Sequence, residues 1–187
     1  TIHGSPDFFS VTKKIHNALQ GSDINLTERK LRVYRETLYE NALMMHPDNE
    51  DIIVVHDPQP LLLIEFYKKH CPWVWRCHID LSQPHPLLWR VISSVVERYD
   101  AAVFHIPEYS QELRIPLLFF MPAIDPFSTT NKPLTEDEIQ ERLGHYRVPT
   151  DLPIVAQVSR FDRWKDPMGV IEAFKMARKE LDATLVL

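Results

Sequence analysis

The clearest signal in this chain is Ile154-Val-Ala-Gln-Val158, an apolar run that leads into the polar stretch Ser159-Arg-Phe-Asp-Arg-Trp-Lys-Asp166. Apolar residues at helical spacing follow between Val170 and Leu181. This order predicts a strand, a loop and a helix. Open α/β sheets bind their ligands at loops that follow the carboxyl ends of parallel strands, so the polar stretch is a candidate binding loop.

Two cationic side chains, Arg160 and Lys165, flank this loop. The planar fork of Arg and the compact charge of Lys suit a diphosphate. The helix start that follows would add unpaired N–H groups and the positive end of a helix dipole. Two plainer readings stay open: a solvated basic turn, or a surface ion pair of Arg160 with Asp162 or Asp166.

The rest of the chain alternates short apolar strands with helical segments. We expect strands at 51–56, 73–78, 101–105 and 117–121, and helices at 26–45, 61–70 and 87–99. Such alternation implies crossover connections between parallel strands. It predicts an α/β fold, with a Rossmann-like parallel sheet, flanking helices and the first β-α-β unit of a second Rossmann-like domain.

Polar residues without periodicity at 126–134 indicate a linker, and a capping box at Thr135 begins another helix. We therefore expect a first domain at residues 1–130 that is incomplete at its N-terminus. A linker and helix at 131–150 and the truncated start of a second domain at 151–187 would follow. The sequence does not begin with Met and stops within an apolar strand, which predicts an internal piece of a longer protein.

The composition excludes several classes of protein. A hydrophobic content of 44% is ample for a packed core, and the net charge of −5 argues against nucleic acid as a partner. No apolar run approaches the roughly 18 residues of a membrane helix, so we expect no membrane contact. Cys71 and Cys77 lack the spacing of a zinc site, and Cys77 is expected to be a buried thiol in a reducing, cytoplasmic location.

Three of the predicted strands end at polar residues: His56 and Asp57 at the first, His78 and Asp80 at the second, and His105 at the third. The carboxyl ends of parallel strands share one edge of a sheet, so we expect these side chains to face one cleft. A carboxylate such as Asp57 suits sugar hydroxyls, and His78 with Asp80 could orient an acceptor or donate to developing negative charge. The alternatives are helix-capping or core-bonded imidazoles, and a divalent metal site for hydrolysis.

Several strings in this sequence resemble the trehalose synthases among the retaining GT-B glycosyltransferases. The matching strings are His56–Pro60, Trp75–Ser82, Phe104–Tyr109, Gln157–Asp162 and Val11–Gly21. Together they run through nearly the whole chain. The chain departs from the family in lacking its N-terminal glycine-rich loop and its later acidic motif, and Asp166 stands where many relatives have Gly.

The resemblance implies an enzyme of two Rossmann-like domains that moves glucose from a nucleotide-glucose to glucose, with retention of configuration, and forms trehalose. It places His78 and Asp80 at the transfer centre as catalytic residues, and Arg160 and Lys165 on the donor diphosphate. The residues it places on the acceptor side are Asp57, Gln59 and Tyr109.

We expect neither a cofactor nor a metal, because the cationic loop already supplies the countercharge that a metal would give. The expected partners are a nucleotide-glucose and glucose, with no nucleic acid, and a homodimer is left open. Two alternatives remain: a sucrose-type or other glycosyltransferase, and a non-catalytic sugar-binding fragment. The isolated chain is expected to be inactive, because it would carry only half of a donor site.

Overall fold

The computed structural model describes residues 2–187, and the chain divides into two compact units, Thr1–Ala123 and Ile124–Leu187. Both units contain parallel strands and helices, which confirms the predicted α/β class. Across residues 2–187, no helix is both long and apolar enough to cross a membrane. The domain bounds expected near residues 130 and 150 stay a prediction.

The first unit is built on a four-stranded parallel sheet whose strands follow one another in chain order. The strands are β1 (Ile53–His56), β2 (Trp73–Arg76), β3 (Ala101–Phe104) and β4 (Leu117–Phe119). Val55 lies beside Trp75, and Trp75 beside Ala102, so neighbouring strands end at a similar level. All four carboxyl ends therefore lie at one edge of the sheet, as the sequence predicts.

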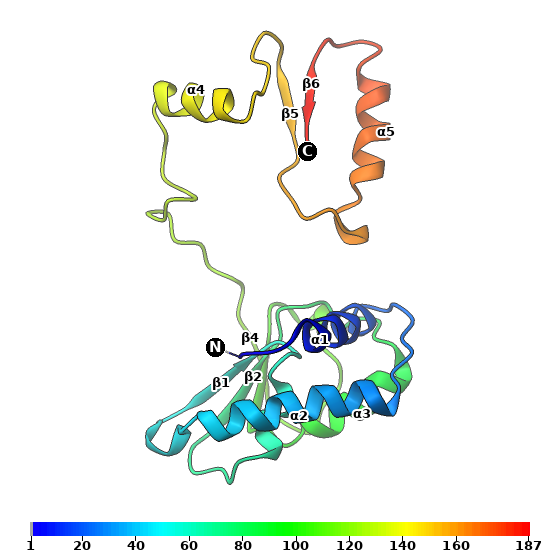
Figure 1. The fold of residues 1–187 in the computed structure, drawn as a ribbon, viewed down its shortest axis with the longest axis vertical. Coiled ribbons are helices and arrows are strands. Elements are labelled where there is room, and N and C mark those ends of the chain that lie inside the picture. Colours follow the sequence, from blue (N-terminus) through cyan, green and yellow to red (C-terminus); the bar gives the residue numbers. More distant parts are fainter. Residues whose placement is uncertain (1) are drawn as a thin grey trace. The chain divides into compact units, whose positions relative to one another are not determined.

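Three helices lie together on one side of this sheet (Figure 1). They are α1 (Pro6–Leu19), α2 (Glu28–Met44) and α3 (Pro86–Val96), accompanied by the short 3₁₀ turns η1 (Pro47–Asn49), η2 (Leu61–Glu65) and η3 (Pro107–Tyr109). The core contains the fully buried Trp75 and Phe104, whose rings pack edge to face at 6.0 Å. Strand residues that point the other way, such as Val54 and Leu118, stay nearly half exposed.

Helix α1 is not among the helices that hydrophobic spacing predicts. Its start nevertheless carries a clear capping signal, because Ser5 Oγ accepts a hydrogen bond from the Phe8 N–H at 3.2 Å. Pro6 occupies the first turn, and Asp7 lies at the positive end of the helix dipole. Just past the helix the chain turns at Gly21, whose φ of 89° is easiest for glycine.

The helix expected at 61–70 is wrong in both length and type, because the structure has only the 3₁₀ turn η2 there. The Tyr99 hydroxyl donates to the Leu61 carbonyl at 2.7 Å, and the Tyr34 hydroxyl donates to the Pro58 carbonyl. Both carbonyls thus accept from tyrosine side chains, one on α2 and one just after α3, in addition to the backbone bonds of the short turn. Tertiary contacts therefore override the local helical pattern.

The second unit holds a two-stranded parallel sheet and two helices. Its elements are α4 (Glu136–His145), β5 (Ile154–Ala156), η4 (Arg163–Lys165), α5 (Pro167–Ala177) and β6 (Thr184–Val186). The predicted capping box is confirmed, since Thr135 and Glu138 each accept from the other's backbone N–H. Of residues 124–187, all of which are described, only Ala183 is buried.

Candidate functional site

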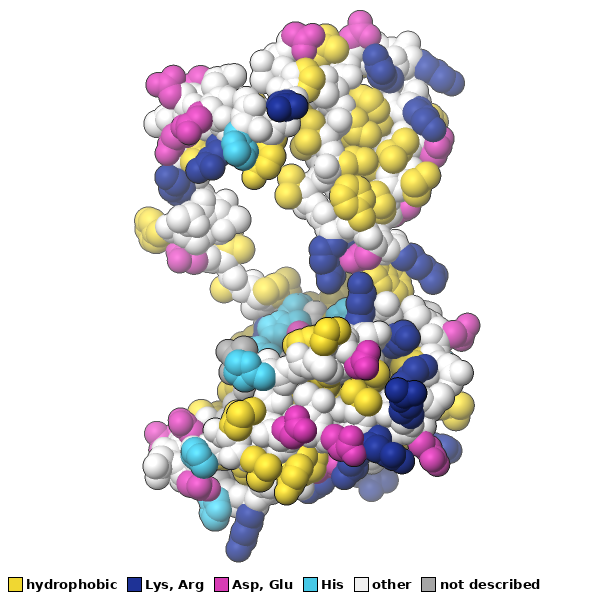
Figure 2. Space-filling model, viewed as in Figure 1, with side chains coloured by type: hydrophobic (Ala, Val, Ile, Leu, Met, Phe, Trp, Pro, Cys, Tyr) yellow, Lys and Arg dark blue, Asp and Glu magenta, His cyan; other side chains and the backbone are white. Residues whose placement is uncertain are grey.

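Three histidine side chains meet at the carboxyl edge of the first unit's sheet. His56 Nδ1 lies 2.8 Å from His78 Nε2, and His78 Nδ1 lies 3.4 Å from His105 Nε2. Histidine side chains form a visible group on the surface of this unit (Figure 2). The prediction that the three share one edge is confirmed. Strand-end position alone, however, did not show that His56 and His105 both contact His78.

Asp57 forms the turn that carries the chain away from β1. Its φ of 64° lies in the left-handed region, which Asp tolerates better than most residues. Its N–H donates to the Arg76 carbonyl at 2.9 Å, and its own carbonyl accepts from Trp75 Nε1 at 3.0 Å. Its Oδ1 accepts from the His78 backbone N–H at 2.9 Å. Asp57 therefore ties the loop after β1 to the loop after β2, in addition to the sugar-binding role that the sequence predicts.

Asp80 and Tyr109 lie on the loops that follow β2 and β3. Asp80 Oδ1 accepts from the Ser82 N–H at 2.7 Å, which closes a local turn. The Leu81 N–H donates to the Tyr109 carbonyl at 3.1 Å, so these two loops are joined. Gln59 lies in the turn after β1. All five site residues predicted in the first unit are thus on loops at this edge, and their catalytic and binding roles stay predictions.

His78 is held as a neutral imidazole. Burial lowers its pKa below the ordinary value of 6.5, because partial removal from water disfavours the imidazolium. The Asp57 carboxylate opposes this effect, whereas His56, Arg76 and His105 add to it. At neutral pH the ring therefore offers one N–H donor and one acceptor nitrogen.

Cys77, between β2 and His78, takes no part in this chemistry. Burial raises the pKa of its thiol to about 12, and the Sγ–H contacts the Ile79 carbonyl at 3.5 Å. The thiolate, which is the nucleophilic form, is therefore absent at neutral pH. The expectation that Cys77 is a buried thiol is confirmed.

The alternative of a divalent metal at His56, Asp57, His78 and Asp80 is not supported by their geometry. Within residues 2–187, no group of three or more His, Cys, Asp or Glu side chains is placed to hold a metal ion. The two histidines point ring nitrogens at each other, while the two carboxylates accept backbone N–H bonds. That the protein needs no metal stays a prediction.

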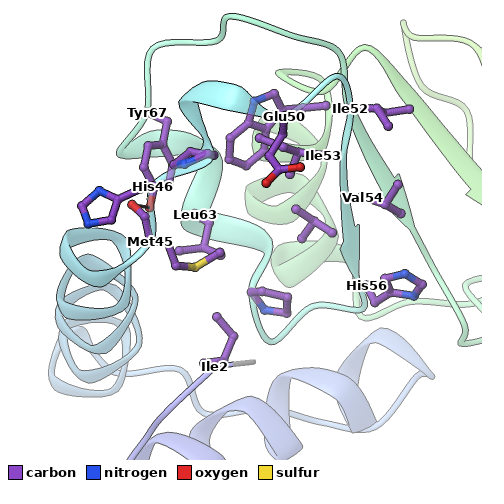
Figure 3. Close-up of a pocket in the computed structure, with 14 residues that line it drawn as sticks. Ile2, Met45, His46, Glu50, Ile52, Ile53, Val54, His56, Leu63 and Tyr67 are labelled. Atoms are coloured by element: carbon purple, nitrogen blue, oxygen red, sulfur yellow. Dashed lines mark hydrogen bonds between the residues drawn. The ribbon is translucent and has the colours of Figure 1, made fainter.

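Two hollows adjoin His56. The first, of about 560 Å³, runs along β1 and is lined mostly by apolar residues such as Ile53, Leu63 and Tyr67 (Figure 3). Such a lining offers few partners for sugar hydroxyls. The second, of about 580 Å³, is lined by His56 and His78 together with apolar residues of the strands. His56 therefore borders both hollows, and the polar part of the second consists of the paired rings and Arg76.

In the second unit, Arg160 and Lys165 lie on the segment between β5 and α5, as predicted. Arg160 Nη2 lies 3.4 Å from Asp162 Oδ2, and the Arg160 side chain is 77% exposed. The surface ion pair that the sequence left open is thus formed. An exposed pair of this kind contributes at most about 1 kcal/mol, so it can open to bind another anion.

The N-terminus of α5 is already capped by the chain itself. Asp166 has a φ of 44°, and its Oδ1 accepts from the Gly169 N–H at 3.0 Å. Pro167 in the first turn has no N–H to offer. The expectation of unpaired N–H groups for a phosphate is therefore wrong at Gly169, because a carboxylate occupies that donor.

Parallel sheets with flanking helices, and polar loops at their carboxyl ends, define a Rossmann-like α/β protein. The fold is similar to a solved structure described as "OtsA apo structure", with a TM-score of 0.68 over 96% of this chain and 50% of that chain. Sequence identity to it is 14%, so the likeness concerns the fold alone. The predicted fold class is confirmed.

The chain belongs to the trehalose synthase family, because residues 1–111 match the family described as "Trehalose synthase, N-terminal domain". Trehalose synthase of Pyrococcus horikoshii is 43% identical over 189 residues, which cover 100% of this chain and 46% of that protein. Trehalose synthase of Rubrobacter xylanophilus is 40% identical over 194 residues, which cover 100% of this chain and 47% of that protein. The chain thus spans about half the length of these relatives.

Proposed function

We propose that the protein to which this chain belongs is a retaining hexosyltransferase that transfers glucose from a nucleotide-glucose to glucose and forms trehalose. The observation that carries the proposal is the identity of 43% and 40%, along the entire chain, to proteins named trehalose synthase. The nucleotide-glucose donor and the retention of configuration rest on the sequence resemblance.

The cationic loop of the second unit has a clear task in this reaction. The bond between glucose C1 and a diphosphate oxygen breaks, and a bond from C1 to the acceptor oxygen forms on the same face. The acceptor proton goes to the leaving diphosphate. Arg160 and Lys165 would stabilise the negative charge that grows there, and because they supply this countercharge the proposal needs no metal and no cofactor.

The first unit would hold the sugars at its carboxyl sheet edge. We assign His78 and Asp80 to the transfer centre, where a neutral imidazole can hydrogen-bond a sugar hydroxyl without adding charge. The residues assigned to the acceptor side are Asp57, Gln59 and Tyr109. The division between the two roles rests on the sequence resemblance, and the location of all five residues at one edge of the sheet is compatible with it.

The test uses the full-length protein with ADP-, UDP- or GDP-glucose and glucose. We expect a non-reducing disaccharide, with both anomeric centres in the donor's configuration by NMR. Release of free glucose alone would contradict transfer to an acceptor. Transfer to fructose alone would favour the sucrose-type alternative.

Two controls narrow the interpretation. Transferase activity should persist in the presence of a chelator. If a chelator abolished the activity and one divalent ion restored it, a metal site would again have to be considered. The 187-residue chain should form no disaccharide under the same conditions. If the full-length protein binds glucose but transfers nothing with any donor, the sugar-binding alternative would replace the proposed reaction.

A further inference from the structure

The two contacts of His78 differ in strength. Its Nε2 lies 2.8 Å from His56 Nδ1, and the two ring planes differ by only 11°. Its Nδ1 lies 3.4 Å from His105 Nε2, with the planes at 71°. Hydrogen bonds weaken as they lengthen, so the bond to His56 is the firm one and the contact with His105 opens more easily.

The firm bond links the proton position on His78 to the proton position on His56, and the second nitrogen of His78 follows from it. A neutral imidazole carries its proton on one nitrogen and accepts at the other. If His56 Nδ1 donates, the proton of His78 lies on Nδ1, which is then a donor. If His56 Nδ1 accepts, the proton lies on Nε2, and His78 Nδ1 is an acceptor.

The surroundings keep His78 in place and uncharged. Its backbone N–H is held by Asp57 Oδ1 at 2.9 Å. The charged groups that act on its ring are Asp57 and Arg76, and Arg76 Nη2 is itself anchored to the Phe120 carbonyl at 2.9 Å. A second proton on the ring would be repelled by this anchored cation and disfavoured by the two neighbouring imidazoles. The neutral form is therefore favoured, and in this form the choice of tautomer matters.

We propose that His56 is a positioning residue that fixes the tautomer of His78, so that His78 presents Nδ1 to a sugar hydroxyl that displaces His105. The inference rests on the proposed function only for the identity of the sugar. The coupling between the rings stands on their geometry. His56 acts through His78 and is not itself a catalytic residue.

Long-range ¹H–¹⁵N NMR of the imidazole rings tests the coupling in this chain, because the nitrogen shifts distinguish the two tautomers. We expect a single tautomer of His78 in the native chain and a mixture in His56→Leu. His56→Gln, whose amide can still hydrogen-bond, should restore much of the single tautomer. His105→Ala should leave it unchanged. The backbone amide spectrum of each variant checks that the sheet is intact.

Kinetics of the full-length protein test the consequence for catalysis. A well-placed acid–base group contributes about 10²–10⁴-fold, and we expect His56→Leu to lower kcat by about tenfold or more with little change in the KM for nucleotide-glucose. His56→Gln should recover part of this loss, and His105→Ala should change kcat less than His56→Leu.

The inference is overturned if the native chain shows averaged tautomers of His78, or if His56→Leu leaves them unchanged. If His105→Ala changed the tautomer of His78 as much as His56→Leu does, the claim that only the bond to His56 fixes the tautomer would be overturned. If the tautomer results hold and the native full-length protein has no transferase activity, the positioning role stands and the proposed function fails.

Discussion

Arg160 has two roles available to it, and they differ widely in consequence. As the surface partner of Asp162 it contributes at most about 1 kcal/mol to stability. As a ligand of the diphosphate it would stabilise charge that grows in the transition state. We expect Arg160→Ala and Lys165→Ala in the full-length protein to lower kcat by about 10²–10³-fold, with a smaller loss of donor affinity. Steady-state kcat and KM for the donor measure both effects.

Arg163 in the same loop supplies a matched control. Its guanidinium lies over the Trp164 ring at 5.4 Å, so Arg163→Ala removes the same charge from a different position. This variant should keep nearly native turnover. Arg160→Lys should behave like the alanine variant, since a point charge cannot replace a bidentate fork. Near-normal turnover in both Arg160→Ala and Lys165→Ala would leave the loop as an ordinary basic turn.

The lowered pKa of His78 predicts a pH dependence of stability. The unfolded chain has the ordinary value of 6.5, and the folded chain a lower one. Between the two values the unfolded state binds more protons, so the free energy of unfolding falls as the pH drops through 6.5 and levels off below the folded pKa. Above pH 6.5 this contribution to stability is fully present.

Urea unfolding at about pH 7.5 and about pH 5.5 measures this dependence. Acidification should destabilise His78→Gln less than the native chain. His70→Gln serves as the control, because His70 is exposed and lies outside the site. If acid destabilises the His78 and His70 variants equally, His78 is not the group responsible.

At the scale of elements, the turn η2 depends on a tyrosine far away in sequence. Tyr99 is 2% exposed, and its hydroxyl donates to the Leu61 carbonyl at 2.7 Å. Tyr99→Phe removes the hydroxyl from which this buried carbonyl accepts, and the loss of such a hydrogen bond costs about 0.5–1.5 kcal/mol. Urea unfolding should show a lower midpoint with an unchanged m value. Tyr39→Phe removes a hydroxyl from a half-exposed ring on α2 and should change the midpoint little, and equal shifts would contradict this account of η2.

Elements whose signals are local could be predicted from the sequence. Thr135 acts as the N-cap that its position indicates, and β-branched runs bounded by turn residues become strands. The start of α1 carried an equally local signal in Ser5 and Pro6, although its apolar spacing gave none. The turn η2 could not be predicted, because a hydrogen bond from a distant tyrosine decides its type.

In the candidate site, too, some features could be predicted from the sequence and others could not. The rule that parallel strands end at one edge brought His56, His78 and His105 together in the prediction, and the structure agrees. Which ring nitrogens face each other depends on loop conformation, including the left-handed φ of Asp57, and no pattern in the sequence reports it. The cap of Asp166 on α5 depends on the left-handed φ of that residue, which the charge pattern of the loop does not indicate.

At the scale of the whole molecule, the two units differ in how much they bury. The first unit contains a packed core that includes Leu38, Trp75 and Phe104, whereas the second buries only Ala183 among residues 124–187. Apolar burial is the dominant stabilising term in folding, so the first unit should be much the more stable in this chain. Amide hydrogen exchange of the 187-residue chain should therefore show two levels of protection.

We expect amides of β2 and β3 to exchange only through global unfolding of the first unit, and amides of β5 and β6 to exchange faster by about 10³-fold or more, as a stability of about 5 kcal/mol implies. Leu38→Ala, which truncates a fully buried side chain of α2, should cost about 2–5 kcal/mol and lower the protection of β2 and β3 by a matching factor. It should leave β5 and β6 unchanged, because their exchange does not pass through unfolding of that core. Equal protection in both sheets, falling together in Leu38→Ala, would show that the chain unfolds as one cooperative unit and that burial within each unit does not set its stability.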